Sequence, residues 1–184
     1  MSQELSTTSY ALLGLLTFGD DLTGYELKQR ADNTLRFYWV SPAMSKVYTE
    51  LARLADAGLV TAREAGPNKQ STKYRITARG RQSLTRWLER PQVGFPLLKH
   101  PVALRLLVGH MVDPETTTRM MRTHLDALAA RRADLAAVRE SLAGADGPGE
   151  AFRYPSLVAD WGLEYFDGET EILTKLLARL ESET

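Results

Sequence analysis

Residues 41–76 read SPAMSKVYTELARLADAGLVTAREAGPNKQSTKYRI and contain one helical pattern followed by two strand patterns. Ser41 followed by Pro42 predicts a helix start, because serine can bond free amide groups and proline at the first helical position loses no hydrogen bond. The helix is expected to run to about Ala57 and to end at Gly58. Its apolar face is expected to consist of Met44, Val47, Leu51, Leu54 and Ala55, with Tyr48 at the margin.

A β-hairpin is predicted directly after this helix. Side chains alternate in residues 59–64 and again in residues 72–76, which is typical of half-buried strands. The segment between them, residues 65–70, is a polar cluster of turn-forming residues that includes Lys69. We therefore expect a hairpin with a flexible, basic tip.

Two helices are predicted before this stretch. The first spans Leu5 to Phe18, and either Thr7 or Thr8 can cap it. Thr23 and Glu26 have the spacing of a capping box, in which each side chain bonds the backbone amide of the other residue, so a second helix begins there.

A fourth helix is predicted after the hairpin, capped by Thr77 and ending before Pro91, with Leu84, Trp87 and Leu88 on one side. The order is thus three helices, a basic two-stranded hairpin and a further helix. This order is typical of the winged helix-turn-helix fold, in which a helix enters the major groove of DNA.

The second half of the chain is predicted to be helical. A short helix is expected from Val102 to Met111, a long one from Asp113-Pro114, and a last one from Pro155 to about Leu180. The long helix keeps a near-heptad spacing that suggests a coiled-coil seam. That spacing involves Met121, Leu125, Leu128, Arg132, Leu135 and Leu142.

The expected architecture is mainly α with a small β-hairpin. A winged helix-turn-helix domain is assigned to residues 1–90 and a linker, rich in proline, to residues 91–101. Residues 102–184 are assigned to a helical dimerisation domain, in which two long amphipathic helices form an antiparallel hairpin.

Charge is balanced in total but not along the chain. The sequence has 23 basic and 23 acidic residues, yet residues 28–90 hold 13 basic and 5 acidic side chains. Residues 91–184 hold 10 basic and 14 acidic ones. Chance clustering is one explanation; the other is that the first half faces a polyanion while the second half has a different task.

The helix beginning at Ser41 is the candidate for reading DNA. On a helical wheel, Pro42, Ser45, Lys46, Thr49 and Arg53 face away from its apolar side. The alternative for such polar residues is an ordinary solvated face. The predicted base or phosphate contacts on this helix are Ser41, Pro42, Ala43, Ser45, Lys46 and Thr49, and the predicted backbone contacts on the hairpin are Arg63, Lys69 and Lys73.

Residues 9–90 resemble the DNA-binding domain of the PadR family of bacterial transcriptional regulators. The second half is similar to the longer branch of that family, through a Leu97-Leu98 entry and two long helices. The segments that carry the resemblance are Leu22-Thr23-Gly24-Tyr25-Glu26-Leu27, Val47 to Leu54 followed by Gly58-Leu59-Val60, and Lys73-Tyr74-Arg75-Ile76-Thr77 followed by Gly80.

This resemblance implies a homodimer that binds a palindromic operator, acts as a repressor in most members, and is released by a ligand or another signal. Symmetry gives an independent reason to expect a dimer, because two winged helices at a fixed separation read two half-sites about one DNA turn apart.

An effector site is a weaker prediction. Aromatic residues crowd one stretch of the second half, where they line either a slot for a flat organic molecule or the dimer core. They are Phe152, Tyr154, Trp161, Tyr165 and Phe166.

No metal site and no cofactor are expected. His100, His110 and His124 each stand alone in sequence, without a second ligand at metal-binding spacing, which indicates structural or surface roles. The acidic cluster Glu164, Asp167, Glu169 and Glu171 is interpreted as a solvated helix face.

The remaining features exclude several classes of protein. The absence of cysteine excludes disulfides and thiol catalysis, and the sequence lacks the motifs of hydrolases, P-loop proteins and zinc proteases, so an enzyme is not expected. The longest apolar run, Tyr10 to Phe18, is about half of the ~20 residues that a membrane span needs. The N-terminus lacks the pattern of a signal peptide, and we expect a complete, cytoplasmic chain without membrane association.

Two other functions fit the same residues. The first is a winged helix that binds a protein partner and not DNA, which an acidic or apolar outward face on the third helix would favour. The second is a small-molecule-binding protein or enzyme that uses the aromatic residues of the second half.

Overall fold

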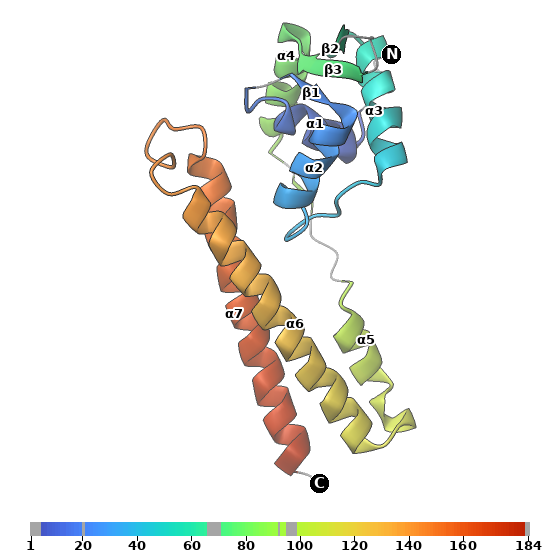
Figure 1. The fold of residues 1–184 in the computed structure, drawn as a ribbon. Helices are drawn as coiled ribbons and strands as arrows, with labels where there is room; N and C mark the ends of the chain where they lie inside the picture. The colour runs from blue at the N-terminus through green and yellow to red at the C-terminus, as the bar shows by residue number, and fades with distance from the viewer. Residues whose placement is uncertain (1–4, 20, 66–70, 92, 95–98, 183–184) are drawn as a thin grey trace. The chain divides into compact units, whose positions relative to one another are not determined.

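The chain divides into two compact units, Met1–Gly94 and Phe95–Thr184. The computed structural model describes residues 5–19, 21–65, 71–91, 93–94 and 99–182, and each unit is considered by itself (Figure 1). The mainly helical fold with a small antiparallel sheet is confirmed. None of the helices in the described part of the chain combines the length and apolar character that crossing a membrane requires.

The described residues of the first unit form four helices: α1 (Thr7–Leu15), α2 (Gly24–Thr34), α3 (Met44–Asp56) and α4 (Ala78–Leu88). The prediction that Thr7 or Thr8 caps α1 is wrong: the Ser6 hydroxyl accepts from the Ser9 amide instead. The capping box of Thr23 and Glu26 is confirmed at the start of α2, and Thr77 caps α4 as predicted.

Helix α3 starts later than the sequence suggested. It begins at Met44, and Ala43 at the N-cap position provides no side-chain bond. The Ser41 hydroxyl donates instead to the carboxylate of Asp32, at 2.6 Å, and Pro42 is buried. The predictions that Ser41 and Pro42 start the helix and that Pro42 faces outward are therefore wrong. The reason is tertiary, because the end of α2 takes the hydroxyl that a helix cap would need.

The sheet has three strands, one more than expected. Strands β2 (Val60–Ala65) and β3 (Ser71–Ile76) form the predicted antiparallel hairpin, called the wing below. A two-residue strand, β1 (Leu22–Thr23), pairs with the other edge of β3, giving the order β1-β3-β2. Two residues are too few to show an alternating pattern, so no pattern in the sequence predicts β1. Lys69 lies outside the described residues.

The core of the first unit lies between the helices and the sheet. Trp87 of α4 stacks on Tyr10 of α1 with 4.8 Å between ring centroids, whereas Leu88 is 67% exposed, contrary to prediction. A Cβ at position 80 would overlap the carbonyl oxygen of Leu59, which directly precedes β2. Glycine is therefore the only residue at this position that allows α4 to approach the wing so closely. The buried apolar residues of α1, α2 and α3 include Leu12, Leu13, Leu27, Ala31, Val47, Leu51 and Leu54.

The second unit is a helical hairpin with a short helix before it. Helices α6 (Pro114–Ser141) and α7 (Arg153–Ser182) lie side by side and antiparallel (Figure 1). Asp113 caps α6 as predicted. In place of one helix over residues 102–111, the chain forms α5 (Pro101–Leu107) and a short 3₁₀ turn, η1 (Gly109–Met111).

Heptad spacing accounts for the contact between α6 and α7. Met121, Leu128 and Leu135 are buried at steps of seven residues, and Gly162 of α7 lies where a Cβ would be 2.7 Å from Leu135. Arg132, expected in the same seam, instead forms a bidentate pair with Asp167 at the surface.

Candidate nucleic-acid interface

The outward face of α3 is polar and accessible. Ala43, Ser45, Lys46 and Thr49, all predicted to contact DNA, are exposed. The Thr49 hydroxyl donates to the Ser45 carbonyl at 2.9 Å, so its proton is used within the helix and its oxygen remains able to accept a hydrogen bond. These side chains have the size and chemistry to reach base edges in a major groove.

A buried carboxylate lies beneath this face. The side chain of Glu50 is only 1% exposed, and its Oε1 accepts from Lys46 Nζ at 2.6 Å and from Arg53 Nη1 at 3.3 Å. Its Oε2 accepts from the hydroxyls of Ser6, at 3.1 Å, and Ser9. Glu50 thus connects the two outward cations of α3 to the start of α1.

This environment stabilises the charged form of Glu50. Burial alone would raise the pKa of the carboxyl, but the hydrogen bonds from Lys46, Ser9 and Ser6 outweigh it and lower the pKa from 4.5 to about 2. Glu50 was not among the predicted site residues. The signal was present in its spacing, four residues after Lys46 and three before Arg53, which places both cations within reach on a helix.

The wing carries two cations at one point of the ladder. Arg63 of β2 and Lys73 of β3 are directly opposite each other, so their side chains leave the same face of the sheet. Like charges in this position are mutually destabilising, and an anion placed between them relieves the repulsion. Arg75, two residues after Lys73 and therefore on the same face, is paired with Asp21.

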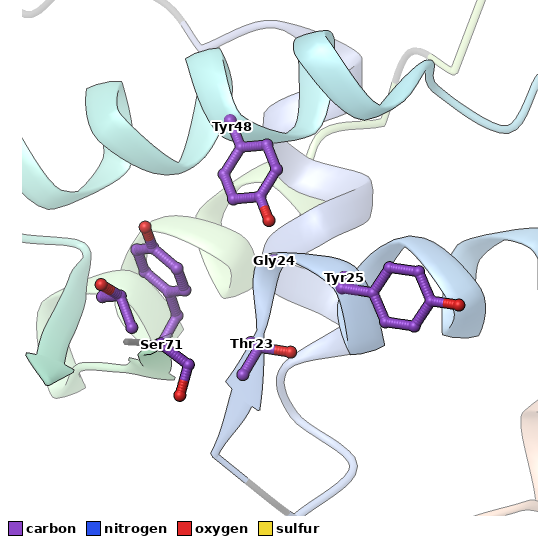
Figure 2. Close-up of a pocket in the computed structure, with 7 residues that line it drawn as sticks. Thr23, Gly24, Tyr25, Tyr48 and Ser71 are labelled. Atoms are coloured by element: carbon purple, nitrogen blue, oxygen red, sulfur yellow. The ribbon is translucent and has the colours of Figure 1, made fainter. Parts of the chain in front are cut away.

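A shallow pocket of about 320 Å³ lies between the start of α2, helix α3 and strand β3 (Figure 2). Tyr48 of α3 covers Gly24, where a Cβ would lie 2.9 Å from the ring carbon Cζ, so only glycine leaves the ring in this position. Burial, and then the neighbouring Tyr48, raise the pKa of Tyr74, which therefore remains a hydrogen-bond donor at neutral pH. The lining residues are Thr23, Gly24, Tyr25, Tyr48, Ser71, Thr72 and Tyr74.

The pocket is suited to an oxyanion. Its tyrosine and serine hydroxyls are donors, whereas Arg63 and Lys73 leave the other face of the sheet, because Lys73 lies between Thr72 and Tyr74 on β3. Hydroxyls of this kind are common partners of DNA phosphates. Tyr48 was expected at the margin of the apolar face, and Tyr25 was not among the predicted DNA contacts, since the position of neither ring relative to β3 is defined until the sheet has formed.

The predicted effector residues lie in or near the first half of α7. Phe152, Tyr154, Trp161 and Tyr165 are exposed in the single chain, and Trp161 stacks on Tyr165 with 5.9 Å between centroids. Phe166 is buried between α6 and α7. Within one chain these four aromatic residues therefore lie at the surface and not in the core.

Two histidines that seemed isolated in sequence lie together. His100 and His124 have 5.6 Å between ring centroids, and Glu169 contacts His100. The interpretation of His100 and His124 as standing alone is therefore wrong, because the fold brings together residues that are far apart in the sequence. Of the acidic cluster, Glu169 is half-buried, while Asp167 and Glu171 pair with Arg132 and Lys175 at the surface.

Two family descriptions match consecutive parts of this chain. Residues 12–86 match the "Transcriptional regulator PadR-like family", and residues 98–181 match "Virulence activator alpha C-term". The boundary between the two matches falls near the boundary between the structural units.

Individual relatives give the same picture over nearly the whole chain. The chain is 28% identical to the negative transcriptional regulator PadR of Bacillus subtilis (strain 168), over 92% of this chain and 87% of the relative. The crystal structure of Bacillus subtilis PadR in complex with operator DNA is similar with a TM-score of 0.83 and 26% identity, covering 95% of this chain and 99% of that one. The same protein in complex with p-coumaric acid gives a TM-score of 0.78 at 26% identity, covering 96% and 99%.

Proposed function

Because this chain belongs to the PadR-like family of transcriptional regulators, we propose that it binds a palindromic operator as a homodimer and represses transcription until a small aromatic molecule releases it. The observation that carries the proposal is the similarity, over 95% of the chain, to a regulator whose structure contains operator DNA. The polar outward face of α3 and the paired cations of the wing supply the matching chemistry.

In this proposal α3 enters the major groove. Ser45, Lys46 and Thr49 contact base edges or phosphates, with Ala43 at the first turn, and Glu50 holds Lys46 in place. Ser41 precedes the helix and approaches only the phosphate backbone, whereas the buried Pro42 makes no contact with DNA. The wing contacts the DNA backbone through Arg63, Lys73 and Lys69. These contacts fix the position of the protein along the duplex and contribute little to recognition of the base sequence.

The homodimer is proposed to form through the second unit, with residues 1–90 for DNA binding, residues 91–101 as a linker and residues 102–184 for dimerisation. Large apolar side chains of α7 remain exposed after the hairpin has formed, among them Leu157, Trp161 and Ile172. Exposed apolar surfaces on a regulator of palindromic DNA are best accounted for by a second copy.

The effector is proposed to be a small aromatic compound that contacts Phe152, Tyr154, Trp161 or Tyr165. Support comes from the p-coumaric acid complex of the related PadR and from the exposed stacked pair of Trp161 and Tyr165. The protein is proposed to act by binding alone, without catalysis or a cofactor, in the cytoplasm where its operator is found.

Selection of bound sequences from random duplex DNA tests the proposal, because a recovered palindrome reports function, symmetry and half-site spacing together. Lys46→Ala and Arg63→Ala should each weaken operator binding and reduce the slope of log K against log salt by about one unit. Lys175→Ala, which removes an exposed cation of α7 paired with Glu171, is the matched control and should change neither.

Two results would refute the proposal. One is a chain that remains monomeric at micromolar concentration, and the other is a chain that retards no duplex at low ionic strength. Unchanged salt slopes in both variants would remove Lys46 and Arg63 from the interface.

A further inference from the structure

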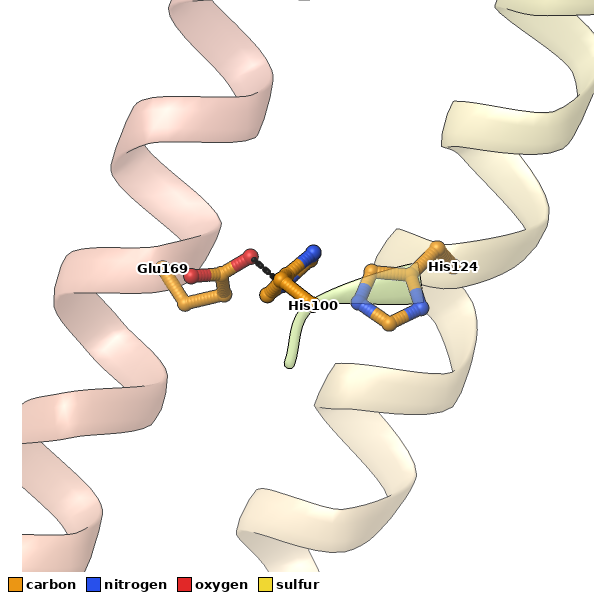
Figure 3. A group of neighbouring side chains, drawn as sticks. All are labelled: His100, His124 and Glu169. Atoms are coloured by element: carbon orange, nitrogen blue, oxygen red, sulfur yellow. Dashed lines mark ion pairs between the residues drawn. The ribbon is translucent and has the colours of Figure 1, made fainter. Parts of the chain in front are cut away.

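Three potential metal ligands from three helices converge in the second unit (Figure 3). His100 lies at the N-cap of α5, His124 in α6 and Glu169 in α7. One ligand atom from each residue lies within 4.8 Å of the other two, and His100 Nε2 is 2.6 Å from Glu169 Oε1. The side chains of His100 and Glu169 are each 14% exposed, so the cluster is largely shielded from solvent but still reachable.

We propose that His100, His124 and Glu169 bind one Zn²⁺ ion, which fixes the start of α5 on the hairpin of α6 and α7. Two imidazoles and one carboxylate are a donor set that zinc accepts, with a fourth position left for water. Zinc bonds of about 2.0–2.1 Å place tetrahedral ligand atoms about 3.3 Å apart. The ligand atoms lie within 4.8 Å of one another, so each has to move inward by less than about 1 Å to reach that spacing.

His100 has a second role that zinc would change. Its Nδ1 accepts from the amide of Ala103 at 3.1 Å, so without metal the Nε2 atom carries the proton that faces Glu169. When Nε2 binds zinc, that proton moves to Nδ1, and the cap of α5 is lost. The ion thus replaces a single helix-capping bond with three bonds to three helices.

Replacing the helix-capping bond by zinc ligation matters because few buried side chains attach α5 to the rest of the second unit. Of its side chains only Val102 is buried, while Leu104 and Leu107 are exposed in the single chain. Helix α5 is also the first helix of the second unit, directly after the segment that joins it to the first. Zinc would therefore control how firmly the second unit holds the end of that segment, independently of whether the chain binds DNA.

The test is equilibrium dialysis of Zn²⁺ against the untagged full-length chain after treatment with a chelator. The background is low, because the sequence has no cysteine and only three histidines. We expect one ion per chain, weakened at least tenfold by His124→Gln and by Glu169→Gln. X-ray absorption of the zinc complex should show nitrogen and oxygen ligands, including two imidazoles.

Two further variants separate ligation from structure. His100→Asn removes the imidazole but supplies a good N-cap, so α5 keeps its capping residue and loss of zinc binding is not a folding defect. His110→Gln, in the exposed η1 turn, is the matched control and should bind zinc like the original chain. Zn²⁺ should raise the unfolding midpoint of the original chain and of His110→Gln only.

The proposal is overturned if the original chain retains no more zinc than a variant with both His124→Gln and Glu169→Gln. It is also overturned if those substitutions leave zinc binding intact while His110→Gln removes it. Either result would leave His100 and Glu169 as a structural ion pair.

Discussion

Replacing Glu50 with glutamine tests whether the buried carboxylate beneath α3 stabilises the first unit. The substitution keeps the shape of the side chain but removes the charge that Lys46 and Arg53 share. Lowering the pKa from 4.5 to about 2 corresponds to about 3.4 kcal/mol of stability at neutral pH. Lys46 and Arg53 are about half exposed, and solvent therefore weakens their contribution to this stabilisation. We expect Glu50→Gln to reduce the free energy of unfolding by about 2–3 kcal/mol.

The loss should depend on pH in a defined direction. The pKa of Glu50 is lower in the folded chain than in the unfolded one, so its contribution is complete above pH 4.5 and disappears as the pH falls towards 2. At pH 3 less than half of the difference between the original chain and Glu50→Gln should remain.

Urea unfolding followed by tryptophan fluorescence, at fixed protein concentration, measures this difference. In a Trp161→Phe background the remaining tryptophans, Trp39 and Trp87, both lie in the first unit, so the signal reports on that unit. Glu171→Gln removes an exposed carboxylate paired with Lys175 and is the control, with stability nearly unchanged. The reasoning fails if both variants unfold at the same urea concentration, or if the loss in Glu50→Gln is equal at pH 3 and pH 7.

Three further substitutions give expected outcomes. Gly24→Ala should displace the ring of Tyr48 and weaken operator binding about tenfold, as measured by fluorescence anisotropy, with little change in stability; unchanged affinity would show that Tyr48 does not contact DNA. Gly80→Ala should lower the thermal midpoint through a loss of about 2–3 kcal/mol, because its Cβ overlaps the backbone carbonyl of Leu59, and a midpoint equal to that of the original chain would contradict this close approach. Leu135→Ala should cost about 2–5 kcal/mol in urea unfolding of the second unit, and a smaller loss would mean that the hairpin repacks around the missing side chain.

Local signals in the sequence predicted most helix starts correctly. Thr23 with Glu26, Thr77 and Asp113 all cap the helices assigned to them, because each bonds an amide within three residues. The prediction that Ser41 starts α3 was wrong, since its hydroxyl bonds the carboxylate of Asp32, nine residues earlier, and not an amide of the helix. Capping rules describe neighbours in sequence and do not account for a competing partner from another element.

The parts of the site that sequence could not provide depend on tertiary contacts. Glu50 is polar and lies on α3 between the two faces, so a helical wheel gave no reason to expect a fully buried charge. Its burial depends on Ser6 and Ser9, more than 40 residues earlier in the chain. Likewise, His100, His124 and Glu169 become neighbours only when α5, α6 and α7 pack together.

The strand order β1-β3-β2 leaves β2 as an edge strand of six residues. An edge of this length is a template on which a strand from another molecule can add, and proteins discourage such aggregation by placing charges there. Arg63 and Glu64 are both exposed on β2. Arg63 therefore has a protective role in the free protein, and replacing it with an apolar residue to alter operator affinity is expected to promote sheet-to-sheet association.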